Sequence, residues 1–84
     1  MAQRYACPCC CCLTLAELPP GTFCICPVCA WEDDNVQYED PAYEGGANRM
    51  SLDDAKANYR AFGARSKKDL ARVRPPTAEE HCGP

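Results

Sequence analysis

Two copies of one four-residue pattern constrain this chain more than any other feature. Cys-Pro-x-Cys occurs at residues 7–10 and again at residues 26–29, with fifteen residues between the two pairs. Four thiolates in two such pairs suit a closed tetrahedral Zn²⁺ site, because Zn²⁺ has no geometric preference of its own and accepts sulfur ligands. We therefore predict one Zn²⁺ per chain, and the predicted ligands are Cys7, Cys10, Cys26 and Cys29. Iron is the alternative metal, since four cysteines in two such pairs also hold iron.

The repeat of the pattern selects the ligands within a crowded first cluster, where five of the six residues from 7 to 12 are cysteines. Aligning the two copies places Cys9 opposite Val28, which cannot bind metal, so Cys10 is the predicted ligand. The same alignment places Cys11 opposite Ala30, where zinc knuckles usually have glycine. Both knuckles therefore lack the residue that most readily adopts a positive φ.

Five further cysteines have no assigned role: Cys9, Cys11, Cys12, Cys24 and Cys82. Some of them could form a second metal site with His81. The alternative, which we favour, is that Cys12 and Cys24 are small buried residues and that Cys82 is an exposed thiol in the tail. A catalytic cysteine would need a base to activate it. The only histidine lies in the predicted tail, so we predict no enzymatic activity.

The rest of the chain supplies little core. Hydrophobic residues make up 46% of the 84 residues, but twelve are Ala and nine are Cys, which leaves 18 large apolar side chains. A hydrophobic core in a chain of this size rarely supplies more than about 3–5 kcal/mol. We therefore expect the domain to need its metal ion in order to fold.

The location of the protein is predicted from two absences in the sequence. No apolar run approaches the roughly 20 residues that a membrane span requires, and no signal peptide is visible at the N-terminus. We therefore expect a cytoplasmic protein, in which paired cysteines bind metal more often than they form disulfides. A mature secreted fragment is the alternative.

The predicted fold class is small, metal-stabilised α+β, with a zinc-ribbon or rubredoxin-like knuckle hairpin followed by one or two C-terminal helices. A single metal-binding domain spans residues 1–76. It is divided into a knuckle hairpin (1–31), an acidic irregular loop (32–50) and a helical segment (51–74). Residues 77–84 are a predicted mobile tail.

The knuckle hairpin is predicted from two strand-like pieces, at residues 13–15 and 22–25. Pro and Gly in residues 18–21 are strong turn formers. The pattern predicts a hairpin with one cysteine pair at each open end.

The helical segment begins with a clear capping signal. Ser51 is a good N-cap residue, acidic residues follow it, and Gly63 is a natural stop. Apolar residues then form one helical face, which we expect to pack on the cysteine module near Trp31. The members of this face are Leu52, Ala55, Tyr59 and Phe62. A shorter second helix is predicted to start at Ser66, with Leu70 and Val73 on its apolar side.

Two features next to the second cysteine pair have competing interpretations. Trp31 could be a platform for stacking bases, but we favour a role in covering the metal site and anchoring the hairpin to the helix. The run Glu32-Asp33-Asp34 could hold a hard cation. Its spacing matches no calcium loop, so we predict an exposed acidic turn.

Charge is distributed unevenly along the chain. The net charge is −3, made of −5 over residues 1–50 and +2 over residues 51–84. Such asymmetry can mark an acidic and a basic face, but the alternative, which we favour, is that both segments are ordinary solvated surface. The basic residues that could contact the phosphates of a nucleic acid are Arg60, Arg65, Lys67, Lys68, Arg72 and Arg74.

Several blocks of sequence resemble the cysteine-rich CPCC family of small bacterial proteins, in the same order. They are Cys7-Pro8-Cys9-Cys10, Ile25-Cys26-Pro27-Val28-Cys29-Ala30-Trp31-Glu32-Asp33-Asp34, Gly45-Gly46-Ala47-Asn48, Ser51-Leu52, Ala55, Asn58-Tyr59, Phe62-Gly63-Ala64 and Val73-Arg74-Pro75-Pro76. The resemblance covers roughly residues 5–76 and implies metal binding, without a settled biochemical activity. The family usually has glycine after its CPCC box, where this chain has Cys11.

Three functions fit these observations. The first is a non-enzymatic protein-interaction module, serving as an adaptor, an accessory subunit or a neutralising partner. The second is a zinc ribbon that binds nucleic acid through the basic residues of the helical segment. The third is a rubredoxin-like iron protein that carries electrons. We predict the first, because the sequence has no catalytic constellation and its metal-binding half is acidic.

Overall fold

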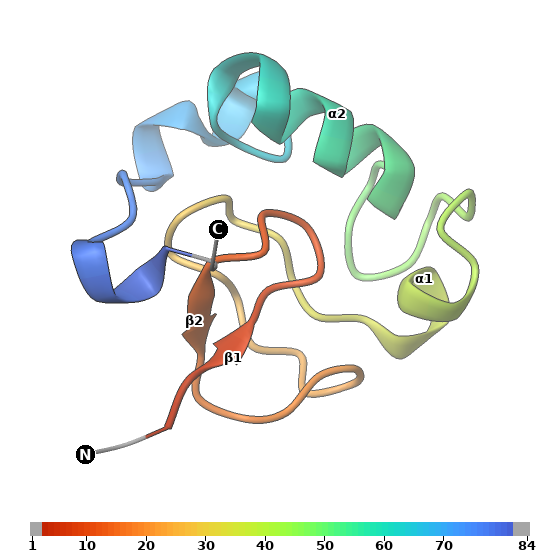
Figure 1. Ribbon diagram of the computed structural model, residues 1–84. Coiled ribbons are helices and arrows are strands. Elements are labelled where there is room, and N and C mark those ends of the chain that lie inside the picture. Colours follow the sequence, from red (N-terminus) through yellow and green to blue (C-terminus); the bar gives the residue numbers. More distant parts are fainter. Residues whose placement is uncertain (1–2, 82–84) are drawn as a thin grey trace.

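A cysteine-rich first half lies beneath an arch of short helices in the computed structural model, which describes residues 3–81 (Figure 1). Its elements in chain order are strands β1 (Tyr5–Ala6) and β2 (Leu13–Leu15), helices α1 (Asn35–Glu39) and α2 (Leu52–Phe62), and the 3-10 helices η1 (Lys67–Arg72) and η2 (Ala78–Glu80). Within the described residues, no helix has the length and apolar character needed to cross a membrane.

Each cysteine pair lies within its own hairpin. Strand β1 pairs antiparallel with β2, with Tyr5 opposite Leu15, so these strands flank the first pair. Around the second pair, Ile25 forms an antiparallel bridge with Glu32. The predicted pairing of residues 13–15 with residues 22–25, as one hairpin with a cysteine pair at each open end, is therefore wrong. Each Cys-Pro-x-Cys turn reverses the chain by itself, so the flanking residues pair locally across it.

Helix α1 interrupts the segment that the sequence predicts to be irregular. Asp34 is its N-cap: the carboxylate accepts hydrogen bonds from the backbone N–H groups of Val36 (2.7 Å) and Gln37 (3.2 Å). A five-residue helix is too short to give an apolar periodicity. The only sequence signal for this helix was its N-cap residue, Asp34, which lies within a run of acidic residues.

Helix α2 follows the prediction closely. The Ser51 hydroxyl accepts a hydrogen bond from the backbone N–H of Asp54 at 3.1 Å, and Gly63 ends the helix with a positive φ of 93°. Leu52 and Ala55 are buried against the cysteine cluster. The predicted packing of this helix near Trp31 is therefore confirmed for its first turns.

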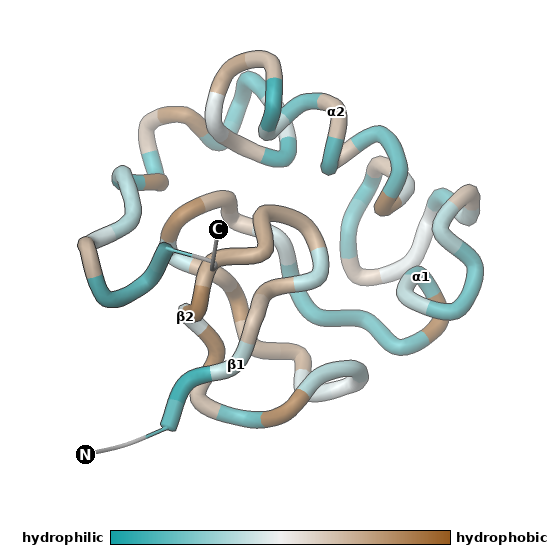
Figure 2. The backbone as a smooth tube through the Cα atoms, in the orientation of Figure 1, coloured by the Kyte–Doolittle hydropathy of each residue, from teal (hydrophilic) through white to brown (hydrophobic). Residues whose placement is uncertain are grey.

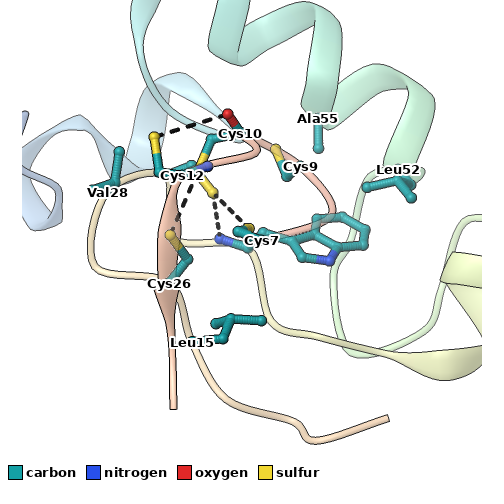
Figure 3. Packing of buried hydrophobic residues seen from close by; sticks show 11 residues of the cluster. Cys7, Cys9, Cys10, Cys12, Leu15, Cys26, Val28, Leu52 and Ala55 are labelled. Carbon is teal, nitrogen blue, oxygen red and sulfur yellow. Dashed lines mark hydrogen bonds between the residues drawn. The ribbon is translucent and has the colours of Figure 1, made fainter. Parts of the chain in front are cut away.

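The centre of the molecule is lined largely with sulfur. Figure 2 shows apolar segments in the middle of the fold and hydrophilic ones along much of the helical arch. The side chains of the core cluster come from both knuckles, β2 and α2 (Figure 3). Its members are Cys7, Cys9, Cys10, Cys12, Leu15, Cys26, Val28, Cys29, Trp31, Leu52 and Ala55. Six of these eleven residues are cysteines, so the candidate metal ligands are also part of the core.

The last turn of α2 contributes less to this core than the apolar stripe suggests. Phe62 is only partly buried, and its ring lies 5.9 Å from the Lys67 ammonium. A fully buried phenylalanine costs about 3–5 kcal/mol when truncated to alanine. We expect Phe62→Ala to lower the free energy of unfolding by about half that amount, measured by urea denaturation of the metal-loaded protein. Ala61→Gly in the same turn is the control. It should lower the free energy of unfolding by only about 1 kcal/mol, because it changes only the intrinsic helix propensity.

The predicted second helix is a 3-10 helix with a polar inner side. Leu70, predicted to be apolar packing, is 44% exposed, whereas Asp69 is buried. The Asp69 carboxylate accepts hydrogen bonds from Arg65 (2.8 Å) and from the Ser66 hydroxyl (2.6 Å). These polar contacts, which spacing alone does not reveal, turn η1 so that its carboxylate rather than its leucine faces the protein.

The first residues of the predicted tail form η2. Glu80 accepts a hydrogen bond from the backbone N–H of Thr77 at 2.9 Å and pairs with both terminal nitrogens of Arg74 at 2.7 and 2.8 Å. The Arg74 guanidinium lowers the pKa of Glu80 to about 2. Cys82, which the sequence analysis predicts to be an exposed thiol in the tail, lies outside the described residues.

Candidate metal centre

The structure brings together the four cysteines that the repeated pattern selects. The sulfur atoms of Cys7, Cys10, Cys26 and Cys29 all lie within 4.8 Å of one another, and all four residues are buried. Across the two knuckles, the Cys7 and Cys29 sulfurs are 3.6 Å apart and the Cys10 and Cys26 sulfurs are 3.7 Å apart. Zinc–sulfur bonds of about 2.3 Å in a tetrahedron require sulfurs roughly 3.8 Å apart. The cluster therefore fits a tetrahedral thiolate-bound ion and could hold one.

The first knuckle is built from backbone hydrogen bonds that run across the Cys-Pro-x-Cys turn. The N–H of Cys11 donates to the carbonyl of Cys7 at 2.8 Å, and the N–H of Cys7 donates to the carbonyl of Cys12 at 2.9 Å. The N–H of Cys12 also points at the sulfur of Cys10, at 3.4 Å. An N–H directed at sulfur stabilises the thiolate form, which is the form that binds metal.

The second knuckle repeats this geometry. The N–H of Ala30 donates to the carbonyl of Cys26 at 2.8 Å, and the N–H of Cys26 donates to the carbonyl of Trp31 at 2.9 Å. The N–H of Trp31 points at the sulfur of Cys29, again at 3.4 Å. The two turns are thus the same local structure, as the sequence repeat predicts.

The missing glycines of the two knuckles leave a conformational cost. Cys11 and Ala30 occupy the aligned positions and have positive φ values of 70° and 74°. This is the left-handed region, which costs an ordinary residue roughly 1–2 kcal/mol. Both knuckles therefore adopt the conformation that glycine would allow without strain.

One contact to the cluster has no counterpart in the sequence analysis. The hydroxyl of Thr14, on β2, lies 2.9 Å from the sulfur of Cys26. Thr14 is buried, so its hydroxyl needs a partner, and a thiolate is a strong acceptor. The alternation of Leu13, Thr14 and Leu15 along a strand was the only available signal, and it does not identify a sulfur as the partner.

The sulfur contacts shift the pKa values of the thiols in opposite directions. The contact with Cys26 raises the pKa of Cys10, and the contact with Cys10 raises that of Cys29. At Cys26, hydrogen bonding from Cys10 lowers the pKa, and the Thr14 hydroxyl contributes to the lowering. These shifts have one physical cause, the crowding of four thiols around a single point, where a divalent cation would replace the thiol protons.

Trp31 covers the site and is not available for stacking. It is 1% exposed and packs in the same cluster as Leu52 and Ala55 of α2. The favoured interpretation of this residue, as an anchor between the cysteine module and the helix, is confirmed.

The acidic run beside Trp31 is not the exposed turn that the sequence predicts. Asp33 is fully buried and accepts hydrogen bonds from the backbone N–H and hydroxyl of Thr22, at 3.0 and 2.8 Å. Asp34 is buried too; the N–H of Ala47 donates to it at 2.8 Å and holds its pKa below the usual range. A side chain at Gly46 would place Cβ 2.8 Å from the Asp34 carboxylate. Asp33 therefore holds the segment before the second knuckle through Oδ2, whereas its Oδ1 is buried without a hydrogen-bond partner, and Asp34 holds the loop after it.

Among residues 3–81, the remaining thiols form no second metal cluster with His81. Cys9 and Cys12 are buried, as predicted for Cys12. Cys24 is only partly buried, and Cys11 is exposed at the surface of the first knuckle. The sulfur of Cys12 lies 3.9 Å from the Tyr59 hydroxyl, so it links the knuckle to α2.

Comparison with known proteins agrees with the cysteine pattern. The model of one family, described as cysteine-rich CPCC, matches residues 5–80 and so covers most of the chain. No curated protein matches the chain.

Proposed function

Since this chain belongs to the cysteine-rich CPCC family, we propose that it is a small zinc-binding module that binds another protein and catalyses no reaction. The observation that carries the proposal is the buried cluster of four thiols. Four protein ligands complete the tetrahedral coordination shell of a zinc ion and leave no coordination position for substrate or water, which is typical of structural zinc. In this proposal the two knuckles form a rubredoxin-like or zinc-ribbon centre, and the ion fixes the surface that a partner recognises.

A reducing compartment suits this chemistry. Thiolates must stay reduced to bind metal, and the cytoplasm keeps them so. We therefore place the protein in the cytoplasm as part of the proposal.

Exposed apolar side chains in the segment between the two knuckles support a protein partner. Leu18, Phe23 and Ile25 are 70%, 52% and 52% exposed. Phe23 also has a positive φ of 57°, although bulky residues rarely adopt that conformation. Backbone strain at an exposed aromatic residue is typical of a functional position, and aromatic residues are enriched in protein interfaces.

Nucleic-acid binding through the C-terminal segment receives less support from the contacts. Arg65 and Arg72 pair with Asp69, and Arg74 pairs with Glu80. Three of the six basic residues assigned to phosphate contacts are thus partly neutralised by the protein itself. The net charge of −3 would also repel an extended polyanion such as a nucleic acid.

Affinity purification of the tagged protein from its native cells tests the proposal. We expect one zinc per chain by metal analysis and a stoichiometric protein partner. Phe23→Ser together with Ile25→Ser should abolish capture of that partner, whereas Leu70→Ser, a matched change on the exposed side of η1, should retain it. A red, iron-containing preparation would indicate the electron-transfer alternative. Co-purification of nucleic acid in place of protein would overturn the proposed partner class.

A further inference from the structure

A small hollow between the start of α2 and η1 is lined mainly by positive charge. Its volume is about 260 Å³. Four basic side chains line it, together with one carboxylate and one hydroxyl. These residues are Arg49, Arg65, Lys68, Arg72, Asp69 and Ser66, and Met50 completes the lining. We call this hollow the basic cleft; its formal charge is +3, four positive charges and one negative, in a chain whose net charge is −3.

The carboxylate organises two of the cations. One oxygen of Asp69 accepts from Nε of Arg65 at 2.8 Å, and the other accepts from Nη1 of Arg72 at 3.1 Å. Nη1 of Arg65 also donates to the side-chain oxygen of Asn48 at 2.6 Å. Asp69 therefore cancels one charge and, with Asn48, holds the largely buried Arg65 guanidinium in place, whereas Arg72 is exposed apart from this single contact.

The backbone of Arg65 is tied to the metal centre. Its N–H donates to the carbonyl of Cys29 at 2.8 Å, and its carbonyl accepts from the Asn58 side chain at 2.8 Å. One cation of the cleft is thus hydrogen-bonded through its backbone to the second knuckle. Preorganised donors lose little entropy when a ligand binds.

The chemistry and size of the cleft select a compact dianion. Guanidinium groups present planar forks of N–H donors that match the oxygens of phosphate. The volume of the hollow lies below the roughly 300–1,000 Å³ of pockets that hold drug-sized ligands, so it suits a small ligand, and a phosphate group is small enough to enter it. We infer that the basic cleft binds one phosphate group carried as a monoester. This inference goes beyond the proposed interaction module and depends neither on its partner nor on which metal fills the cysteine site.

The basic residues around the cleft do not extend it into a row of cations that a nucleic-acid backbone could follow. Arg74 pairs with Glu80, the Lys67 ammonium lies over the ring of Phe62, and Arg60 lines a different hollow beside the first knuckle. A strand of nucleic acid offers successive monoanionic diesters, which a row of cations would follow. Four cations around one hollow instead suit a phosphomonoester, which carries two negative charges on a single phosphate group.

Titrations of the metal-loaded protein, followed by NMR at constant ionic strength in chloride, test this inference. Constant ionic strength matters because salt screens exposed charges. We expect inorganic phosphate and methyl phosphate to shift the amide signals of residues 49, 50 and 65–72 saturably, with dimethyl phosphate at least about tenfold weaker because it carries one charge instead of two. A short phosphoserine peptide identifies the source: tighter binding than methyl phosphate indicates a phosphorylated protein, and equal binding indicates a small phosphomonoester.

Matched variants distinguish the cleft from general attraction of anions. Arg49→Gln combined with Lys68→Gln removes two exposed cations that line it and should weaken methyl phosphate binding at least about tenfold. Lys67→Gln removes the same kind of charge one residue away, outside the lining, and should change the affinity less than about twofold. Equal affinity in the double variant, shifts spread over the whole chain, or tighter binding of an oligonucleotide lacking a terminal phosphate would each overturn the inference.

Discussion

Removal of the metal at neutral pH should unfold this domain. Six of the eleven residues in its core cluster are cysteines, and four of these form the candidate site. Without an ion, four buried thiols face one another where a well-packed core would have apolar side chains. Because the site is absent in the unfolded chain, metal binding becomes folding free energy, on the order of 10 kcal/mol for structural zinc. Far-ultraviolet circular dichroism during titration with a strong chelator should therefore show loss of the helical signal.

Single cysteine substitutions should separate the ligands from the other thiols. Cys26→Ser should abolish stoichiometric metal binding and folding, because it removes the sulfur that contacts both Cys10 and Thr14. Cys24→Ser is the matched control, since Cys24 lies two residues away and outside the cluster. It should bind one ion and lose less than about 1 kcal/mol. A metal-free sample with native circular dichroism would contradict this account.

Acid should act in the same direction as the chelator. A bound cation lowers the pKa of each thiolate below its unfolded value, so the stabilisation is present at neutral pH and is lost as the pH falls. Release of metal and loss of helix should therefore occur in one transition on acidification.

Substitution of a single buried amide should cause the second-largest loss of stability. Gln37 is fully buried. Its Nε2 donates to the backbone carbonyls of Tyr43, Asn48 and Met50 at 3.1, 3.2 and 2.9 Å. Its Oε1 accepts from the backbone and side-chain nitrogens of Asn48, at 3.1 and 2.9 Å. This one side chain therefore holds the loop between α1 and α2 in place.

Gln37→Met keeps the volume and removes all of these hydrogen bonds. Each buried polar group left without a partner costs about 1–3 kcal/mol, so we expect a loss of at least about 3 kcal/mol. In a domain of this size that corresponds to a melting temperature lower by more than about 12 °C. Glu39→Met, on the exposed side of the same helix, should shift it by only a few degrees. Equal melting temperatures for the two variants would show that the amide network contributes little.

The local features of the fold were predictable because they depend on local chemistry. The repeated Cys-Pro-x-Cys pattern fixed both knuckles, since each turn closes its own hydrogen bonds within six residues. Ser51 and Gly63 likewise marked the two ends of α2 through capping groups next to them in sequence. The four cysteines of the cluster followed from the alignment of the two turns.

The features that sequence could not show depend on contacts between distant residues. The pairing of β1 with β2 replaced the predicted hairpin because both strands flank one knuckle. The burial of Asp33, Asp34 and Asp69 depends on donors at Thr22, Ala47 and Arg65, and polar residues with such partners look like surface residues in a sequence. Gln37 is the extreme case, because its three carbonyl partners lie 6 to 13 residues away.

The separation of the site into two self-contained turns has a consequence for how the protein acquires its structure. Each hairpin closes a short loop, so its formation is a fast local event. An ion in the candidate site would join two such loops, whose nearest cysteines, Cys10 and Cys26, are 16 residues apart. Joining them therefore involves little of the slow search that distant strand pairing demands. If the cluster binds its ion as proposed, we expect the folding rate to rise with the concentration of free metal, because the ion brings together two turns that can each form alone.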